Sequence, residues 1–205
     1  MHEPAHQVGE GHAATVAPLQ QRVSGAILDA AARVLAARGR EASIGEIAAA
    51  AGVARATVYR YFPSRQTLLD ELARLAVSRA GERLDSAGVH QVGAAEGVAR
   101  AVRALLDVGD LFLVLARERV RPDPDIYDQL LLAPLRRLVE AGQTSGQLRA
   151  DLPPSWLSES LVGLVVAVLS ARPAHGREDT AASIASLFLE GTRARPSGVP
   201  AGDQS

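Results

Sequence analysis

The stretch from Ser43 to Leu69 constrains the fold more than any other part of the chain, because it has the pattern of short helices joined by a tight turn. Ser43 is a preferred N-cap residue and Glu46 stands three positions later, which predicts a capping box at the first helix start. Gly52 is the residue type that most readily takes a positive φ, so it predicts the end of this helix. The pattern therefore predicts a helix followed at once by a sharp turn.

A second helix is predicted from about Arg55 to Phe62, where Pro63 stops it. Ser64 can then cap a third helix. A helical wheel assigns the second helix two faces. The inward face would contain Ala54, Val58, Tyr61 and Phe62, and the outward face would contain Ala56, Thr57, Tyr59 and Arg60.

The charge on this stretch indicates its partner. Two helices at a tight turn form a helix-turn-helix, in which the second helix lies in the major groove of DNA. Between Ile47 and Leu69 the chain has three arginines and no acid. Residues 21–86 carry ten arginines against seven acids, although the whole chain has a formal net charge of −1. The positive excess thus coincides with the motif, as it should in a DNA-binding surface.

The same residues resemble a known family. The string A-G-V-x-x-x-T-V-Y-x-Y-F followed by x-S-R-x-x-L-L, at residues 51–69, is similar to the DNA-binding domain of the tetracycline-repressor (TetR) family. The resemblance implies that Tyr59 contacts a phosphate and that Arg65 stands where the family usually has a phosphate-binding lysine. Tyr61 could instead be half-buried, and Arg60 could be only a solvated charge. The full set of implied DNA-binding residues is Ser43, Ile44, Arg55, Ala56, Thr57, Tyr59, Arg60, Tyr61 and Arg65.

Two positions depart from the family pattern. Ala54 replaces the usual Ser or Thr at the recognition-helix cap, which removes about 1 kcal/mol of local stabilisation. Arg65 replaces the lysine, so a phosphate contact there could be bidentate.

An all-α fold is predicted for the whole chain. The residues are 47% hydrophobic but only 3% aromatic, and segments rich in Ala, Leu and Arg favour helices. The resemblance implies an N-terminal three-helix helix-turn-helix domain (20–80, motif 43–62) joined to a C-terminal helical ligand-binding and dimerisation domain (81–192). Flexible tails are expected at 1–19 and 193–205. Further helices are predicted at Gln20–Gly39, Ala94–Val108, Asp110–Arg119, Ile126–Gly142 (interrupted or kinked at Pro134), Pro153–Ala171 and Glu178–Gly191.

The last two helices are apolar on several faces, so they are either central in the core of one chain or paired with a second copy. The family precedent is a four-helix dimer interface with two helices from each chain. A symmetric dimer would hold two recognition helices about 34–36 Å apart, which suits a near-palindromic operator. The predicted interface residues are Leu161, Val165, Val168, Ile184, Leu187 and Phe188.

The expected function is a dimeric repressor that a small molecule releases from its operator. An apolar pocket within residues 94–171 would bind this effector, whose identity the sequence does not reveal. The candidate pocket residues are Arg103, Leu106, Phe112 and Trp156, each of which a solid core or surface would also explain. The alternatives within the same class are an effector-independent regulator and an activator.

Other classes of function lack their residues. The chain has no cysteine, no Gly-rich phosphate loop and no G-x-S-x-G elbow, so we expect neither an enzyme nor a cofactor. His2, His6 and His12 have no metal-site spacing, and no metal is expected. A helical interaction module without DNA binding remains the rival from another class. The N-terminus does not have the pattern of a signal peptide, and Leu161–Ser170 is too short to span a membrane, so a cytoplasmic location is expected.

Overall fold

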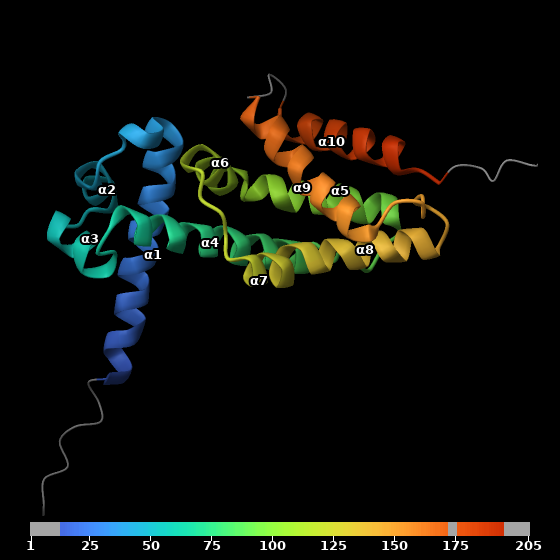
Figure 1. The fold of residues 1–205 in the computed structure, drawn as a ribbon. Coiled ribbons are helices and arrows are strands. Elements are labelled where there is room, and N and C mark those ends of the chain that lie inside the picture. Colours follow the sequence, from blue (N-terminus) through green and yellow to red (C-terminus); the bar gives the residue numbers. More distant parts are fainter. Residues whose placement is uncertain (1–12, 172–175, 195–205) are drawn as a thin grey trace, which may run out of the picture. The chain divides into compact units, whose positions relative to one another are not determined.

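The computed structural model describes residues 13–171 and 176–194, and in these ranges its regular structure consists of helices and one isolated β-bridge (Figure 1). The chain divides after Leu72 into an N-terminal and a C-terminal unit. The predicted all-α class is confirmed. Helix α4 (Arg65–Ser86) contributes to both units, and the predicted domain boundary at 80/81 also falls within it. No helix in the described part of the chain is long and apolar enough to cross a membrane.

The N-terminal unit packs α1 (Ala13–Arg38) on α2 (Ile44–Ala51), and α2 on α3 (Arg55–Tyr61). A 3-10 turn, η1 (Gly39–Glu41), follows α1. The side chains that these helices bury are mostly aliphatic, as the composition predicts. The largest contributors are Ile27, Leu35, Ile47, Val58, Phe62 and Leu68.

Helix α1 is longer than the sequence analysis predicts, since it begins at Ala13 and not at Gln20. Residues 13–19 were expected to belong to a flexible tail, and this expectation is wrong for them. Three of these seven residues are alanine, which has the highest helix propensity, whereas Pro18 is disfavoured inside a helix, so local propensities left the start of α1 open. Residues 1–12 of the predicted tail, with His2, His6 and His12, lie outside the described residues.

The C-terminal unit surrounds helix α5 (Ala94–Asp107), which contacts α8, α9 and α10 (Figure 1). Its core is formed mainly by leucines and valines. The helices that complete the unit are α6 (Gly109–Glu118), α7 (Pro124–Tyr127), the π-helix η2 (Asp128–Leu132), α8 (Ala133–Thr144), α9 (Pro154–Ser170) and α10 (Arg177–Thr192).

The apolar faces of α9 and α10 lie mostly inside this unit. Four of the six residues predicted to form a dimer interface are buried within the chain itself, namely Leu161, Val165, Ile184 and Phe188. A side chain that is already buried has no surface to offer a second copy, so the prediction is wrong for these four. Val168 is half-buried, and Leu187 is 61% exposed. The sequence analysis left two alternatives for these helices: a place in the core of one chain, or pairing with a second copy. Most of their apolar residues belong to the core of the chain itself.

Near Pro134, where the sequence analysis predicts an interruption or a kink, the chain leaves the regular α-helix and forms the π-helix η2 just before α8. Pro134 has no N–H to donate to the carbonyl of Leu130, and its ring would crowd that carbonyl in a regular α-helix. The wider π turn separates the two groups. The Leu130 carbonyl oxygen then lies so close to Gly81 of α4 that a Cβ added there would be 2.9 Å from it.

Replacing Gly81 by alanine is therefore expected to destabilise the protein by about 1–3 kcal/mol, because a backbone carbonyl cannot swing aside as a flexible side chain can. Gly25 in α1 is the matched control, since a Cβ added there meets nothing within 4 Å. Gly25→Ala should stabilise by about 0.5–1 kcal/mol through helix propensity. Urea unfolding of both variants measures the difference, and equal effects at the two glycines would contradict the close α4–η2 approach.

The residues at the end of α10 and directly after it are tied to the loop between α8 and α9. Leu148 and Arg193 form an antiparallel β-bridge, and the Arg149 N–H donates to the Thr192 carbonyl at 2.8 Å. The predicted flexible tail from residue 193 is therefore wrong for Arg193 and Ala194. Residues 195–205 lie outside the described residues.

Candidate DNA interface

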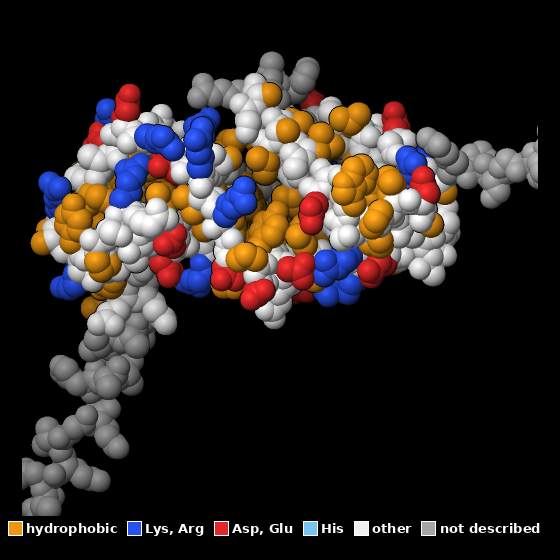
Figure 2. Space-filling view, in the orientation of Figure 1, with side chains coloured by type: hydrophobic (Ala, Val, Ile, Leu, Met, Phe, Trp, Pro, Cys, Tyr) orange, Lys and Arg blue, Asp and Glu red, His pale blue; other side chains and the backbone are white. Residues whose placement is uncertain are grey.

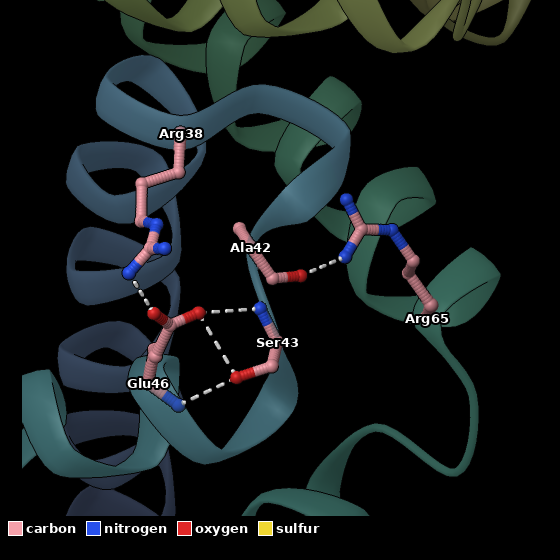
Figure 3. Close-up of polar contacts among 5 residues, drawn as sticks. All are labelled: Arg38, Ala42, Ser43, Glu46 and Arg65. Atoms are coloured by element: carbon pink, nitrogen blue, oxygen red, sulfur yellow. Dashed lines mark hydrogen bonds and ion pairs between the residues drawn. The ribbon is translucent and has the colours of Figure 1, made fainter.

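The start of α2 is held by the predicted capping box, which Figure 3 shows in detail. The Glu46 N–H donates to the Ser43 hydroxyl at 3.2 Å. In return the Glu46 carboxylate accepts from the Ser43 N–H at 2.8 Å and from the Ser43 hydroxyl at 3.0 Å. Arg38 forms an ion pair with the other carboxylate oxygen. These bonds secure the end of α1 to the start of α2.

The turn after α2 also has the predicted geometry. Gly52 adopts a left-handed conformation with φ of 67°, and its N–H donates to carbonyls of the preceding turn. Ala54 then stands at the N-cap of α3 with an extended backbone and no side-chain hydrogen bond to the helix. The missing Ser or Thr hydroxyl thus leaves the N-terminal N–H groups of α3 without a side-chain cap from Ala54.

Helix α3 exposes three of the four side chains that the sequence analysis placed outward, and it exposes Arg55 as well. Arg55, Ala56, Tyr59 and Arg60 are exposed, whereas Val58 is fully buried and anchors the helix. Thr57 was expected to point outward and is half-buried, so only part of this side chain is available to a base edge. Ala54 was expected to point inward and is exposed.

Tyr59 has a defined position on this surface. Its hydroxyl accepts a hydrogen bond from Arg55 Nη2 at 3.2 Å, and the guanidinium lies 5.5 Å from the centre of its ring. These residues are four apart, so they meet on one helix face. The pair combines a phenol and a cation on the side of α3 that is open to solvent, which suits contact with a phosphate.

Arg60 and Tyr61 form a similar pair at the end of α3. The Arg60 guanidinium lies 5.3 Å from the Tyr61 ring centre. Tyr61 is half-buried, which is the alternative that the sequence analysis gave to a DNA contact, while Arg60 is exposed. Arg60 therefore remains available to a partner.

Arg65 has an internal role that the sequence analysis did not foresee. Its Nη1 donates to the Ala42 carbonyl at 2.5 Å, which ties the start of α4 to the connection between α1 and α2 (Figure 3). No local pattern could have indicated this bond, because the two residues are 23 positions apart and the acceptor is a backbone atom. A loss of DNA affinity in Arg65→Ala would therefore include a structural contribution besides any phosphate contact.

The capping box makes the stability of the N-terminal unit depend on pH. The hydrogen bond from the Ser43 N–H, then that from the Ser43 hydroxyl, and the nearby Arg38 hold the pKa of Glu46 below its ordinary value of 4.5. A lowered folded-state pKa means that this stabilisation is present above pH 4.5 and is lost as the pH falls through the folded value. We expect wild type to be more stable than Glu46→Gln at pH 7, with a difference that shrinks below pH 4.5. Urea unfolding at both pH values measures it, and a constant difference would contradict the effect of the charge.

The four candidate pocket residues do not converge on one site. Leu106 and Phe112 are buried in the core, whereas Trp156 is 56% exposed and Arg103 is exposed. Arg103 Nε donates to Glu178 of α10 at 3.2 Å, which gives it a structural role. The prediction of a shared pocket is thus corrected for Arg103 and Trp156, since neither lies in the interior.

Comparison with known proteins agrees with this geometry. The model of a family described as bacterial regulatory proteins, tetR family, matches residues 27–72. The HTH-type transcriptional repressor LfrR of Mycolicibacterium smegmatis is 34% identical over 138 residues, which cover 67% of this chain and 72% of that protein.

Solved structures show the same fold. The LfrR crystal structure from Mycobacterium smegmatis in complex with proflavine has a TM-score of 0.70 and 30% identity, covering 84% of this chain and 97% of that one. The regulator SCO0520 from Streptomyces coelicolor has a TM-score of 0.60 and 28% identity, covering 85% and 99%. A regulatory protein from Rhodococcus RHA1, at 20% identity, has a TM-score of 0.70 over 85% and 99%.

Proposed function

Because the chain belongs to the TetR family of bacterial transcriptional regulators, we propose that it is a dimeric repressor that leaves a near-palindromic operator when a small molecule binds its C-terminal unit. The observation that supports operator binding most directly is the exposed surface of α3. Arg55, Tyr59 and Arg60 are all exposed there, and the chain has no acid between Ile47 and Leu69. Such a surface attracts phosphates and lets α3 approach base edges.

The proposed dimer interface is the outer face of α9 and α10. Among the described residues only four large hydrophobic side chains are exposed, and the C-terminal unit holds two of them, Trp156 on α9 and Leu187 on α10. Figure 2 shows hydrophobic side chains on the visible face over these helices. The same two helices also expose small residues, which allow helices to approach closely. They are Gly163 and Ala167 on α9, and Ala182, Ser183 and Ser186 on α10.

Selection of bound sequences from a random pool of duplex DNA tests the first part of this proposal. We expect an inverted repeat whose half-sites are about 10 base pairs apart or a multiple of that, because a two-fold dimer presents its recognition helices symmetrically. Binding should weaken steeply with salt. Enrichment of an asymmetric sequence, or of none, would contradict the operator model and would favour a helical interaction module.

The effector is proposed to bind in the interior of the C-terminal unit, near Leu106 of α5 and Phe112 of α6. Both side chains are buried and apolar, which suits an apolar ligand. Proflavine is the natural first probe, because it occupies the LfrR crystal structure. If it prefers a conformation with misplaced recognition helices, adding it should release the selected operator, and operator DNA should weaken proflavine binding equally.

Two other regulators would have the same fold. An effector-independent regulator would keep its operator with proflavine and with any other compound screened. An activator would bind the same operator but raise transcription from a template that carries it. In vitro transcription with and without the protein distinguishes an activator from the proposed repressor, and repeating it with proflavine distinguishes an effector-independent regulator.

A further inference from the structure

Helix α1 extends well beyond the part of the N-terminal unit that the family model covers. That model begins at Ile27, which is also the first fully buried residue in the part of α1 from Leu19 onward. The preceding residues 19–26 are all exposed or half-buried. Figure 1 shows α1 continuing past the level of α2 and α3. This segment therefore contributes little to the core of its unit.

The segment lies next to the end of the recognition helix. A surface groove of about 610 Å³ is lined by Leu19, Gln20 and Val23 of α1 together with Arg60 and Tyr61 of α3. Leu19 is 62% exposed, so an apolar side chain at the edge of this groove is open to solvent. The exposed surface of α3 is thus continuous with the start of α1.

The charge of the segment suits a polyanion. From residue 13 to residue 28 the chain has one arginine, Arg22, and no acid. Successive residues of an α-helix are about 100° apart, so Gln20 and Arg22 flank the stripe formed by Leu19 and Val23 on its two sides. Gln21 projects from the opposite side of the helix. Gln20 and Arg60 line the groove itself, and Arg22 lies on the helix surface just beside it.

We propose that this first part of α1 binds the sugar–phosphate backbone of DNA beside the groove that α3 enters, and so lengthens each half-site. An α-helix with its side chains is about 10–12 Å wide, and the major groove of DNA is about 12 Å wide. Because α3 fills the major groove, α1 must lie on the DNA backbone that flanks it. Gln20 and Arg22 donate to phosphates, and Leu19 contacts deoxyribose. The contact carries no base preference.

This inference rests on the proposed function, and its test uses adjacent matched substitutions in the full-length chain. Gln20→Ala and Gln21→Ala remove the same group from neighbouring positions, one bordering the groove and one opposite. Arg22→Ala and Arg33→Ala each remove one exposed arginine from the same helix face, about 16 Å apart along the axis. Affinity for the selected operator is measured by fluorescence anisotropy over a range of salt, with hydroxyl-radical footprints.

We expect the double variant with Gln20→Ala and Arg22→Ala to bind roughly tenfold more weakly, with a salt slope reduced by about one. Its footprint should lose protection only at the outer edge of each half-site. The Gln21→Ala and Arg33→Ala controls should keep the full footprint. The inference is overturned if wild type binds its operator and the double variant has the same footprint and slope. Failure of wild type to bind any duplex would instead overturn the proposed function.

Discussion

Replacing Ile184 by aspartate is expected to unfold the C-terminal unit, whereas the same change three residues later, Leu187→Asp, should leave it folded and abolish the dimer. Both residues belong to α10, but Ile184 is 1% exposed and Leu187 is 61% exposed. An unpaired carboxylate in the core costs about 4–5 kcal/mol or more, which is a large part of the stability of an ordinary domain. On the surface the same carboxylate is solvated.

Thermal unfolding and sedimentation velocity together measure both outcomes. We expect Leu187→Asp to sediment as a monomer. Its melting temperature should lie within a few degrees of that of the wild-type monomer, measured at a protein concentration low enough to dissociate the dimer. Leu187→Ala should weaken the dimer less, because it removes contact area without adding a charge. A wild-type sedimentation profile for Leu187→Asp would rule out the α9–α10 face as the interface. A wild-type melting curve for Ile184→Asp would contradict the burial of this residue.

Replacing Tyr59 by alanine is expected to weaken operator binding by about 1–3 kcal/mol without changing the melting temperature. Tyr59 is 41% exposed, and its described contacts are with Arg55 of the same helix, so its loss leaves no cavity in the core. The alanine variant loses a contact with DNA and also the ring that orients Arg55. Both losses reduce affinity in the complex rather than stability of the free protein.

Tyr59→Phe separates the two contributions. It keeps the ring beneath Arg55 and removes the hydroxyl that accepts from Nη2 at 3.2 Å. We expect an affinity between those of wild type and Tyr59→Ala, measured by anisotropy on the selected operator at one salt concentration. If Tyr59→Ala bound the operator as tightly as wild type does, Tyr59 would have no part in the interface.

Local patterns predicted the recognition motif well because short-range physics decides them. The capping box of Ser43 and Glu46, the left-handed Gly52 and the end of α3 before Pro63 are all present as expected. Each depends on groups within a few residues of one another. The capping box joins a hydroxyl to an N–H one turn away, the left-handed turn needs a residue without a Cβ, and the helix stop needs a residue without an N–H. Such relations hold wherever the segment is placed in the fold.

The apolar character of α9 and α10 was also clear from the sequence, but which of their residues face inward was not. Periodicity shows that Ile184 and Leu187 are apolar and three apart on a helix, yet only α5 packed against α10 decides that one is buried and the other exposed. The bond from Arg65 to the Ala42 carbonyl joins residues 23 positions apart in the same way.

The sequence by itself thus determined the helical class, the recognition motif and its family, because caps, turns and breakers act over one or two turns of chain. Only the tertiary structure decided which apolar side chains remain on the surface and that Arg65 holds a carbonyl. These depend on which distant segments come together, and burial is a property of that packing rather than of any residue type.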